Sequence, residues 1–110
     1  MPSLVYLEMV YLLRGEMGAG KTHWVKNALP QYDVTSPTFS IINQYADNLY
    51  HMDLYRLERD SDFLHLGLWE ILMDRGNTVY IEWPERLPKR YIDLIKGGEY
   101  QEISIASRHR

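Results

Sequence analysis

Apolar runs separated by polar turns recur along the chain and predict the strands of a sheet. The runs cover residues 10–13, 39–45, 49–52, 79–81 and 103–105. The first run, Val10-Tyr11-Leu12-Leu13, is short and continuous, which is typical of a strand buried on both faces. Between the second and third runs, Asp47-Asn48 has the residue types of a hairpin turn. The last run is short and has the character of an edge strand.

Helical patterns alternate with these runs. A segment over 23–29 can be helical and must end near Pro30, because proline disrupts a helix. Ser61 is a candidate N-cap for a helix that runs through Asp74. Its apolar positions on one face are Leu64, Leu68, Ile71 and Leu72, whereas Trp69 is assigned to the core. A further helix is predicted over 87–95. The alternation indicates an α/β fold whose sheet, given the hairpin, is mixed and largely parallel, with flanking helices.

Length and composition limit the possibilities further. The 110 residues fit a single small domain, and 45% hydrophobic with 25% charged residues is ordinary for a globular protein. The absence of cysteine excludes disulfides and thiolate metal sites, and it agrees with a cytosolic location. A formal net charge of −3 argues against nucleic-acid binding by the surface as a whole. The apolar start of the chain lacks a basic region, carries Glu8 and is too short to cross a bilayer, so no membrane association is expected.

Residues 15–22 fit the phosphate-loop pattern G-x-x-x-x-G-K-[ST]. Glycines allow positive φ and bring backbone N–H groups close to phosphate oxygens. The helix that follows would direct free N–H groups and the positive end of its dipole at the same anion. Lys21 would reach the β- and γ-phosphates, and the Thr22 hydroxyl would ligate Mg²⁺. The residues predicted to bind the nucleotide, ATP with Mg²⁺, are Gly15, Met17, Gly18, Ala19, Gly20, Lys21 and Thr22.

Two acids end apolar runs, and strand ends are where ligands bind in such sheets. Asp53 follows one run and Glu82 another. One could hold Mg²⁺ while the other orients or deprotonates an attacking water, and the residues alone leave the assignment open. Trp83, next to Glu82, either packs over the site or belongs to the core. The four histidines, at positions 23, 51, 65 and 109, lack the spacing of metal ligands.

A hydroxyl-rich segment, Thr35-Ser36-Pro37-Thr38, lies between the first predicted helix and the second strand. It is either a loop that senses the γ-phosphate, as a switch loop does, or an ordinary turn.

Five blocks of sequence, taken together, resemble the TsaE family in order and spacing. They are G-E-M-G-A-G-K-T, V-T-S-P-T-F, Y-H-M-D-L-Y-R-L, L-G-L-W-E and I-E-W-P-E-R-L, all within residues 10–88. The family is the P-loop ATPase component of bacterial tRNA threonylcarbamoyladenosine synthesis. The resemblance implies a P-loop NTPase-like fold and ATP hydrolysis in support of the TsaB–TsaD pair. TsaD modifies adenosine 37, so tRNA contact would be indirect.

The resemblance also assigns roles to individual residues. Thr22 and Glu82 would be the metal ligands, and Asp53 would be the acid required for hydrolysis, acting with Lys21. Thr38 and Glu85 would lie near the nucleotide. The N-terminal segment is shorter than is usual in the family, so base contacts are expected to be reduced.

Two other functions remain open at this point. A phosphate loop also serves small-molecule kinases, although a chain this short has little material for an acceptor pocket or lid. A nucleotide-gated binding module that needs no hydrolysis is the other alternative.

Overall fold

The structure is a computed structural model, and it describes residues 8–37 and 41–106. The elements in chain order are β1 (Val10–Arg14), α1 (Lys21–Ala28), β2 (Ile42–Ala46), β3 (Leu49–Asp53), α2 (Asp60–His65), α3 (Leu68–Met73), β4 (Thr78–Glu82), the short 3₁₀ helix η1 (Pro84–Arg86), α4 (Lys89–Lys96) and β5 (Tyr100–Ser104).

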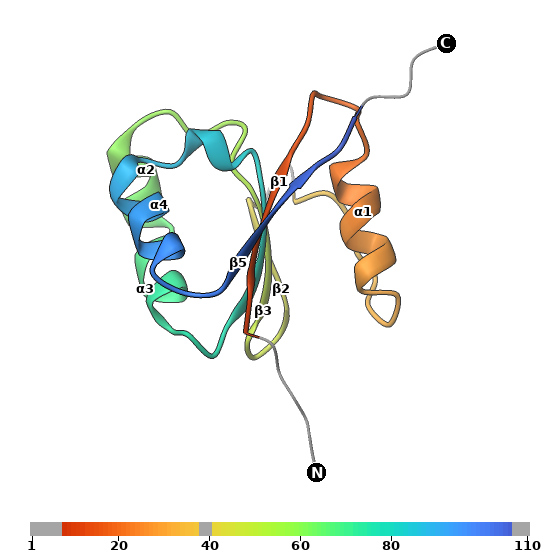
Figure 1. The fold of residues 1–110 in the computed structure, drawn as a ribbon, viewed down its shortest axis with the longest axis horizontal. Helices are drawn as coiled ribbons and strands as arrows, with labels where there is room; N and C mark the ends of the chain where they lie inside the picture. Colours follow the sequence, from red (N-terminus) through yellow and green to blue (C-terminus); the bar gives the residue numbers. More distant parts are fainter. Residues whose placement is uncertain (1–7, 38–40, 107–110) are drawn as a thin grey trace.

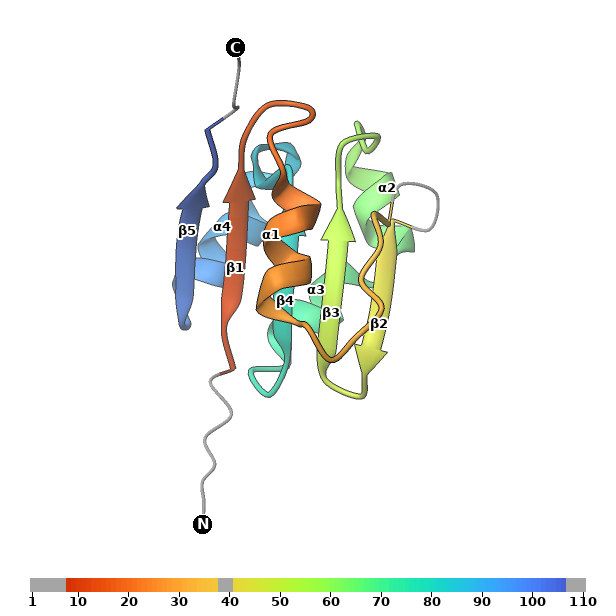
Figure 2. The same cartoon turned by 90° about the vertical axis from the view of Figure 1, so that its right-hand side faces the viewer.

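The strands form one sheet in the order β2-β3-β4-β1-β5. Only the β2–β3 pair is antiparallel, and the other three pairs are parallel. Helices α2, α3 and α4 cover one face of the sheet, and α1 lies on the other (Figure 1, Figure 2). The predicted α/β class with a mixed, largely parallel sheet is confirmed, as are the hairpin at Asp47-Asn48 and the edge position of the last strand.

The core lies on both faces of the sheet. The larger cluster packs under α2, α3 and α4 around Phe63 and Tyr91, and the smaller one packs under α1 around Val25 and Leu13. In β1, consecutive residues Leu12 and Leu13 are both fully buried, as the apolar run predicts for a strand covered on both sides.

Parallel pairing brings the carboxyl ends of three strands to one edge of the sheet. Glu82 of β4 is the register partner of Leu13 in β1 and of Asp53 in β3. The phosphate-loop pattern begins just beyond β1, at Gly15. Residues far apart in sequence therefore meet at this edge, which is where α/β sheets bind ligands.

The single helix predicted over 61–74 is wrong, because Gly67 divides it into α2 and α3. Gly67 has a φ of 70°, a left-handed conformation that turns the chain and resets the helical face. Consequently Leu64 is 62% exposed, while Leu68 and Leu72 are buried. Trp69 is half-buried and packs against the core, with its ring edge-on to Tyr91.

The predicted N-cap of this region is also wrong. Arg59, rather than Ser61, precedes the first helical residue of α2. The carboxylate of Asp62 accepts hydrogen bonds from the backbone N–H groups of Glu58 and Arg59, at 3.2 and 3.1 Å. Asp62 lies at the third helical position, so its side chain reaches back to the N-cap backbone, as the acidic residue of a capping box does.

Other boundaries differ by a few residues. Helix α1 begins at Lys21, inside the loop pattern itself, and α4 begins only at Lys89 because extended Pro88 precedes it. Strand β5 begins earlier than predicted, at Tyr100. Of the second predicted strand, residues 39 and 40 lie outside the described residues. No helix within the described ranges is long and apolar enough to span a membrane.

Candidate functional site

The loop between β1 and α1 is built on glycines that its geometry requires. Gly18 and Gly20 have φ of 79° and 104°, which an L side chain rarely adopts. At Gly15, a Cβ would lie 2.8 Å from the carbonyl oxygen of Ile105, just past β5. The loop therefore packs tightly against β5 at its start and presents open backbone at Gly18 and Gly20, where an anion could be bound.

Lys21 is buried and folded over this loop. Its Nζ donates hydrogen bonds to the carbonyl oxygens of Gly15, at 2.6 Å, and Glu16, at 3.0 Å. The same ammonium lies 4.2 Å from the centre of the Trp83 ring, a cation–π contact. Trp83 has a φ of 62°, an uncommon left-handed conformation for a large side chain. Trp83 therefore combines the two positions that the sequence allowed, because it lines the cleft and also packs against the larger core cluster.

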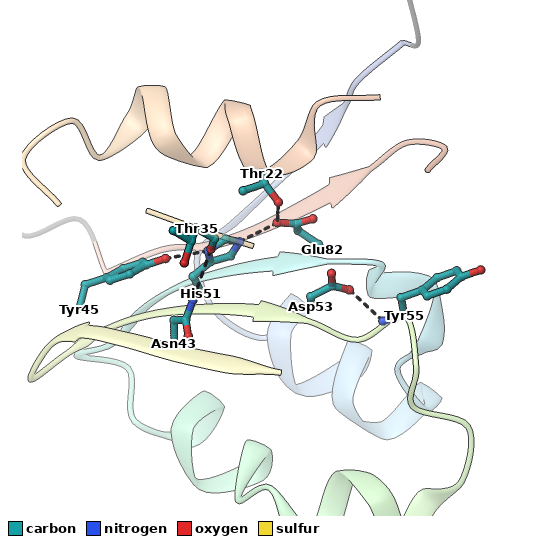
Figure 3. A network of polar contacts seen from close by, with 8 residues as sticks. All are labelled: Thr22, Thr35, Asn43, Tyr45, His51, Asp53, Tyr55 and Glu82. Atoms are coloured by element: carbon teal, nitrogen blue, oxygen red, sulfur yellow. Dashed lines mark hydrogen bonds and ion pairs between the residues drawn. The ribbon is translucent and has the colours of Figure 1, made fainter. Parts of the chain in front are cut away.

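Thr22 and Glu82 form a contact that joins α1 to β4. The Thr22 hydroxyl donates to Oε2 of Glu82 at 2.7 Å, and the Glu82 residue is only 3% exposed (Figure 3). Oε2 also lies 2.6 Å from Nε2 of His51. The pair offers a hydroxyl and a carboxylate, which are oxygen ligands of the type that Mg²⁺ prefers. Within the described ranges no group of three or more His, Asp and Glu side chains is placed for a metal, so a metal here would rely on this pair and on phosphate or water oxygens.

Asp53 lies at the end of β3, next to Glu82 in register. Its Oδ1 accepts a hydrogen bond from the backbone N–H of Tyr55 at 3.0 Å (Figure 3). Burial raises the pKa of the Asp53 carboxyl above 3.8, and the charge of Glu82 adds to the increase. The Tyr55 N–H, His51 and Lys21 oppose it without cancelling it. A carboxyl group with a raised pKa is better suited to accept a proton near neutral pH.

A cleft of about 370 Å³ brings these groups together. It is lined by Met17, Gly18, Gly20, Lys21, Thr22, His23, Ser36, Asp53, Tyr55, Arg56, Glu82 and Trp83. Seven of the residues predicted for the site are among them. Ala19 instead lines an adjacent hollow between α1 and the end of β5, and Gly15 contributes its carbonyl to Lys21.

Four further residues that the sequence singled out are Thr35, Ser36, Thr38 and Glu85. Ser36 of the hydroxyl-rich segment lines the cleft, and the carbonyl of Thr35 accepts a hydrogen bond from Asn43. Thr38 lies outside the described residues. Glu85 does not line the cleft, and its carboxylate lies 3.7 Å from Arg14.

Sequence reasoning did not single out four residues at or behind the cleft. His23, Tyr55 and Arg56 line it, and His51 lies behind Glu82. His51 precedes Asp53 by two positions, and alternate residues of a strand share a face. The H-x-D spacing was therefore a usable signal for His51. Tyr55 and Arg56 lie on a turn, where no such periodicity applies, and His23 is an exposed residue in the first turn of α1.

Comparison with known proteins identifies the family. Residues 2–110 match the family described as threonylcarbamoyl adenosine biosynthesis protein TsaE. The chain is also similar to curated proteins named tRNA threonylcarbamoyladenosine biosynthesis protein TsaE. That of Nostoc sp. is 41% identical over 113 residues, covering 86% of this chain and 69% of the relative. That of Bacillus subtilis is 36% identical over 112 residues, covering 89% and 69%.

A third relative, from Borreliella burgdorferi, is 39% identical over 82 residues, covering 69% of this chain and 60% of the relative. The chain thus spans roughly two thirds of the length of these relatives. The match to the family nevertheless extends over nearly the whole sequence and includes the cleft. The chain belongs to the TsaE family of threonylcarbamoyl adenosine biosynthesis proteins.

Proposed function

We propose that the chain binds ATP with Mg²⁺ and hydrolyses it to ADP and phosphate within the machinery that forms N6-threonylcarbamoyladenosine in tRNA. It would act through homologues of TsaB and TsaD and would not transfer the group itself. One observation carries the proposal: a single cleft holds the glycine loop, a buried lysine, a threonine–glutamate pair and an aspartate with a raised pKa. The names of the relatives supply the link to tRNA modification.

Binding would rest on the loop and Lys21. The open backbone at Gly18 and Gly20 and the first N–H groups of α1 would receive phosphate oxygens. The Lys21 ammonium, now bonded to two carbonyl oxygens of its own loop, is already at the cleft. Exchanging those neutral acceptors for a phosphate adds attraction between opposite charges to the hydrogen bonds of the ammonium.

Thr22 and Glu82 would hold the metal ion. When bound, Mg²⁺ supplies positive charge that offsets the charge of the phosphates. The chain contributes two oxygen ligands from different elements that already lie 2.7 Å apart. Holding ligands in place before binding reduces the cost of ordering them.

Asp53 would act on the attacking water. Its carboxylate would accept a proton as the water oxygen forms a bond to the terminal phosphorus and the bond to ADP breaks. The Tyr55 N–H fixes the orientation of Oδ1. Hydrolysis needs only a water beside the terminal phosphate, whereas phosphoryl transfer needs a second site that binds the acceptor.

The deciding experiment measures phosphate release by the purified chain with and without a purified TsaB–TsaD pair. We expect the pair to form a complex with the chain and to stimulate release from the wild type but not from Asp53→Asn. Labelled phosphate on a co-incubated metabolite would instead indicate a kinase. Absence of both complex and stimulation would overturn the role in tRNA modification. Full support of modification by a hydrolysis-deficient variant would replace hydrolysis with nucleotide gating.

A further inference from the structure

His51 is a fully buried histidine on β3 with no part in the roles assigned above. We propose that it is a positioning residue that holds the Glu82 carboxylate beside Thr22, so that the two metal ligands are in place before Mg²⁺ arrives. The inference rests on the proposed function and extends it to a residue outside the cleft lining.

The contacts of His51 define a directed chain of hydrogen bonds. Nε2 lies 2.6 Å from Oε2 of Glu82, and Nδ1 lies 3.0 Å from the Tyr45 hydroxyl (Figure 3). An ionised Glu82 only accepts, so Nε2 carries the hydrogen, and in a neutral ring Nδ1 then accepts from Tyr45. Tyr45 thus donates to His51, and His51 donates to Glu82 of the metal-ligand pair.

The fold places Tyr45 and His51 so that this series of hydrogen bonds can form. Tyr45 lies at an irregularity of β2, where the pairing with β3 shifts register between Gln44 and Ala46. A bulge of this kind changes the direction of a side chain. His51 itself sits on β3, which pairs with β4 and so brings the imidazole next to Glu82.

The physical need for His51 comes from the burial of Glu82. A carboxylate that is only 3% exposed must be hydrogen-bonded, because water cannot solvate it. Two donors converge on the same oxygen, Thr22 from one side and His51 from the other. Thr22 would bond to the metal when Mg²⁺ binds, so His51 remains as the donor that fixes Glu82. Partners of this kind typically change metal affinity about 10- to 100-fold when removed.

The test measures ATP affinity by isothermal titration calorimetry, first in excess EDTA and then across a Mg²⁺ series. For His51→Leu we expect an affinity in EDTA close to that of the wild type, because the glycine loop and Lys21 are intact. The Mg²⁺ concentration for half-maximal tightening should rise about 10- to 100-fold. His51→Gln, whose amide N–H can donate to Glu82, should recover most of the loss. His65→Leu, at an exposed histidine on α2, is the matched control and should be unchanged.

The outcomes separate the two proposals. If the wild type binds no ATP, the proposed function fails and this inference fails with it. If the wild type shows Mg²⁺-dependent tightening and folded His51→Leu shows the same midpoint, only the inference is overturned. Should His51→Leu fail to fold, Tyr45→Phe decides, since it removes one hydroxyl and keeps the ring. A smaller rise in the Mg²⁺ midpoint is then expected, and no rise would contradict the positioning role.

Discussion

At the scale of single residues, the raised pKa of Asp53 affects both its proposed role as a proton acceptor and the free energy of unfolding. Burial raises its pKa in the folded protein above the 3.8 of an exposed aspartate. From pH 3.8 upward through that raised pKa, the folded state binds more protons than the unfolded state. The free energy of unfolding therefore falls as pH rises through this window. Above this window, the buried and ionised Asp53 lowers the free energy of unfolding.

Asp53→Asn should accordingly melt at a higher temperature than the wild type at pH 7, with the difference shrinking as the pH falls toward 3.8. The asparagine oxygen can still accept the Tyr55 N–H, so the turn is preserved. ATP binding should persist while phosphate release is lost. Thermal melts by circular dichroism at several pH values, together with a phosphate-release assay, test both parts. A lower melting temperature at pH 7 would contradict the burial cost.

Lys21→Ala tests the phosphate-loop assignment. Losing charge-assisted hydrogen bonds to phosphate should weaken ATP binding about 10- to 100-fold. Lys26→Ala, at an exposed lysine on the same helix, is the matched control and should bind like the wild type. Equilibrium titration with ATP in EDTA measures the phosphate contacts without the metal. Equal affinity of the two variants would rule out the assigned role of Lys21.

At the scale of the elements, the turn at Gly67 separates α2 from α3. Its φ of 70° is costly for any residue with a Cβ, by about 1–2 kcal/mol. We expect Gly67→Ala to reduce the free energy of unfolding by that amount. Gly97→Ala, where φ is −78°, should change it much less. Urea denaturation of both variants provides the comparison, and an equal loss in the two would show that the left-handed conformation is not the cause.

The same turn shows what the sequence could and could not predict. Strands β1, β3 and β4 were predictable because a short apolar run bounded by turn residues is typical of a buried strand. The break at Gly67 was not, since helices tolerate isolated glycines and the apolar spacing from Leu64 to Leu72 fits a single helix. Helix α2 likewise begins after Arg59 rather than after Ser61, with the Asp62 carboxylate bonded to the backbone N–H groups of Glu58 and Arg59. Boundaries of this kind depend on contacts that the local sequence does not specify.

At the scale of the whole molecule, the sheet order determines which candidates meet. Asp53 and Glu82 could be predicted as strand ends, but only the parallel pairing of β3 with β4 makes them neighbours. The contact of Thr22 with Glu82 similarly depends on β1 lying beside β4. The contact of His51 with Glu82 could not be predicted, because the two residues lie 31 positions apart and meet only through the pairing of β3 with β4. Hydrophobic patterning predicts strands without predicting their order.

The charge of the chain leads to a prediction about tRNA. A net charge of −3 offers few sites for phosphate neutralisation, which supplies most non-specific nucleic-acid affinity. The chain alone should therefore not shift tRNA in a gel at about 150 mM salt, whereas a complex with TsaB and TsaD homologues should. A shift by the chain alone at that salt would show a direct tRNA contact.

The central place of β1 has a consequence for synthesis of the protein. Val10 pairs with Val79 on one side and with Tyr100 on the other. Because β4 and β5 both follow β1 at a long distance in the sequence, β1 leaves the ribosome well before either of its neighbours. Leu12 and Leu13 therefore lack strand partners at first. Pairing β1 with β4 and β5 closes long loops of chain, and this step is slow. Until then the nascent chain carries an apolar segment that is prone to aggregate or to bind chaperones, and the cleft cannot form before β4 has paired with β1.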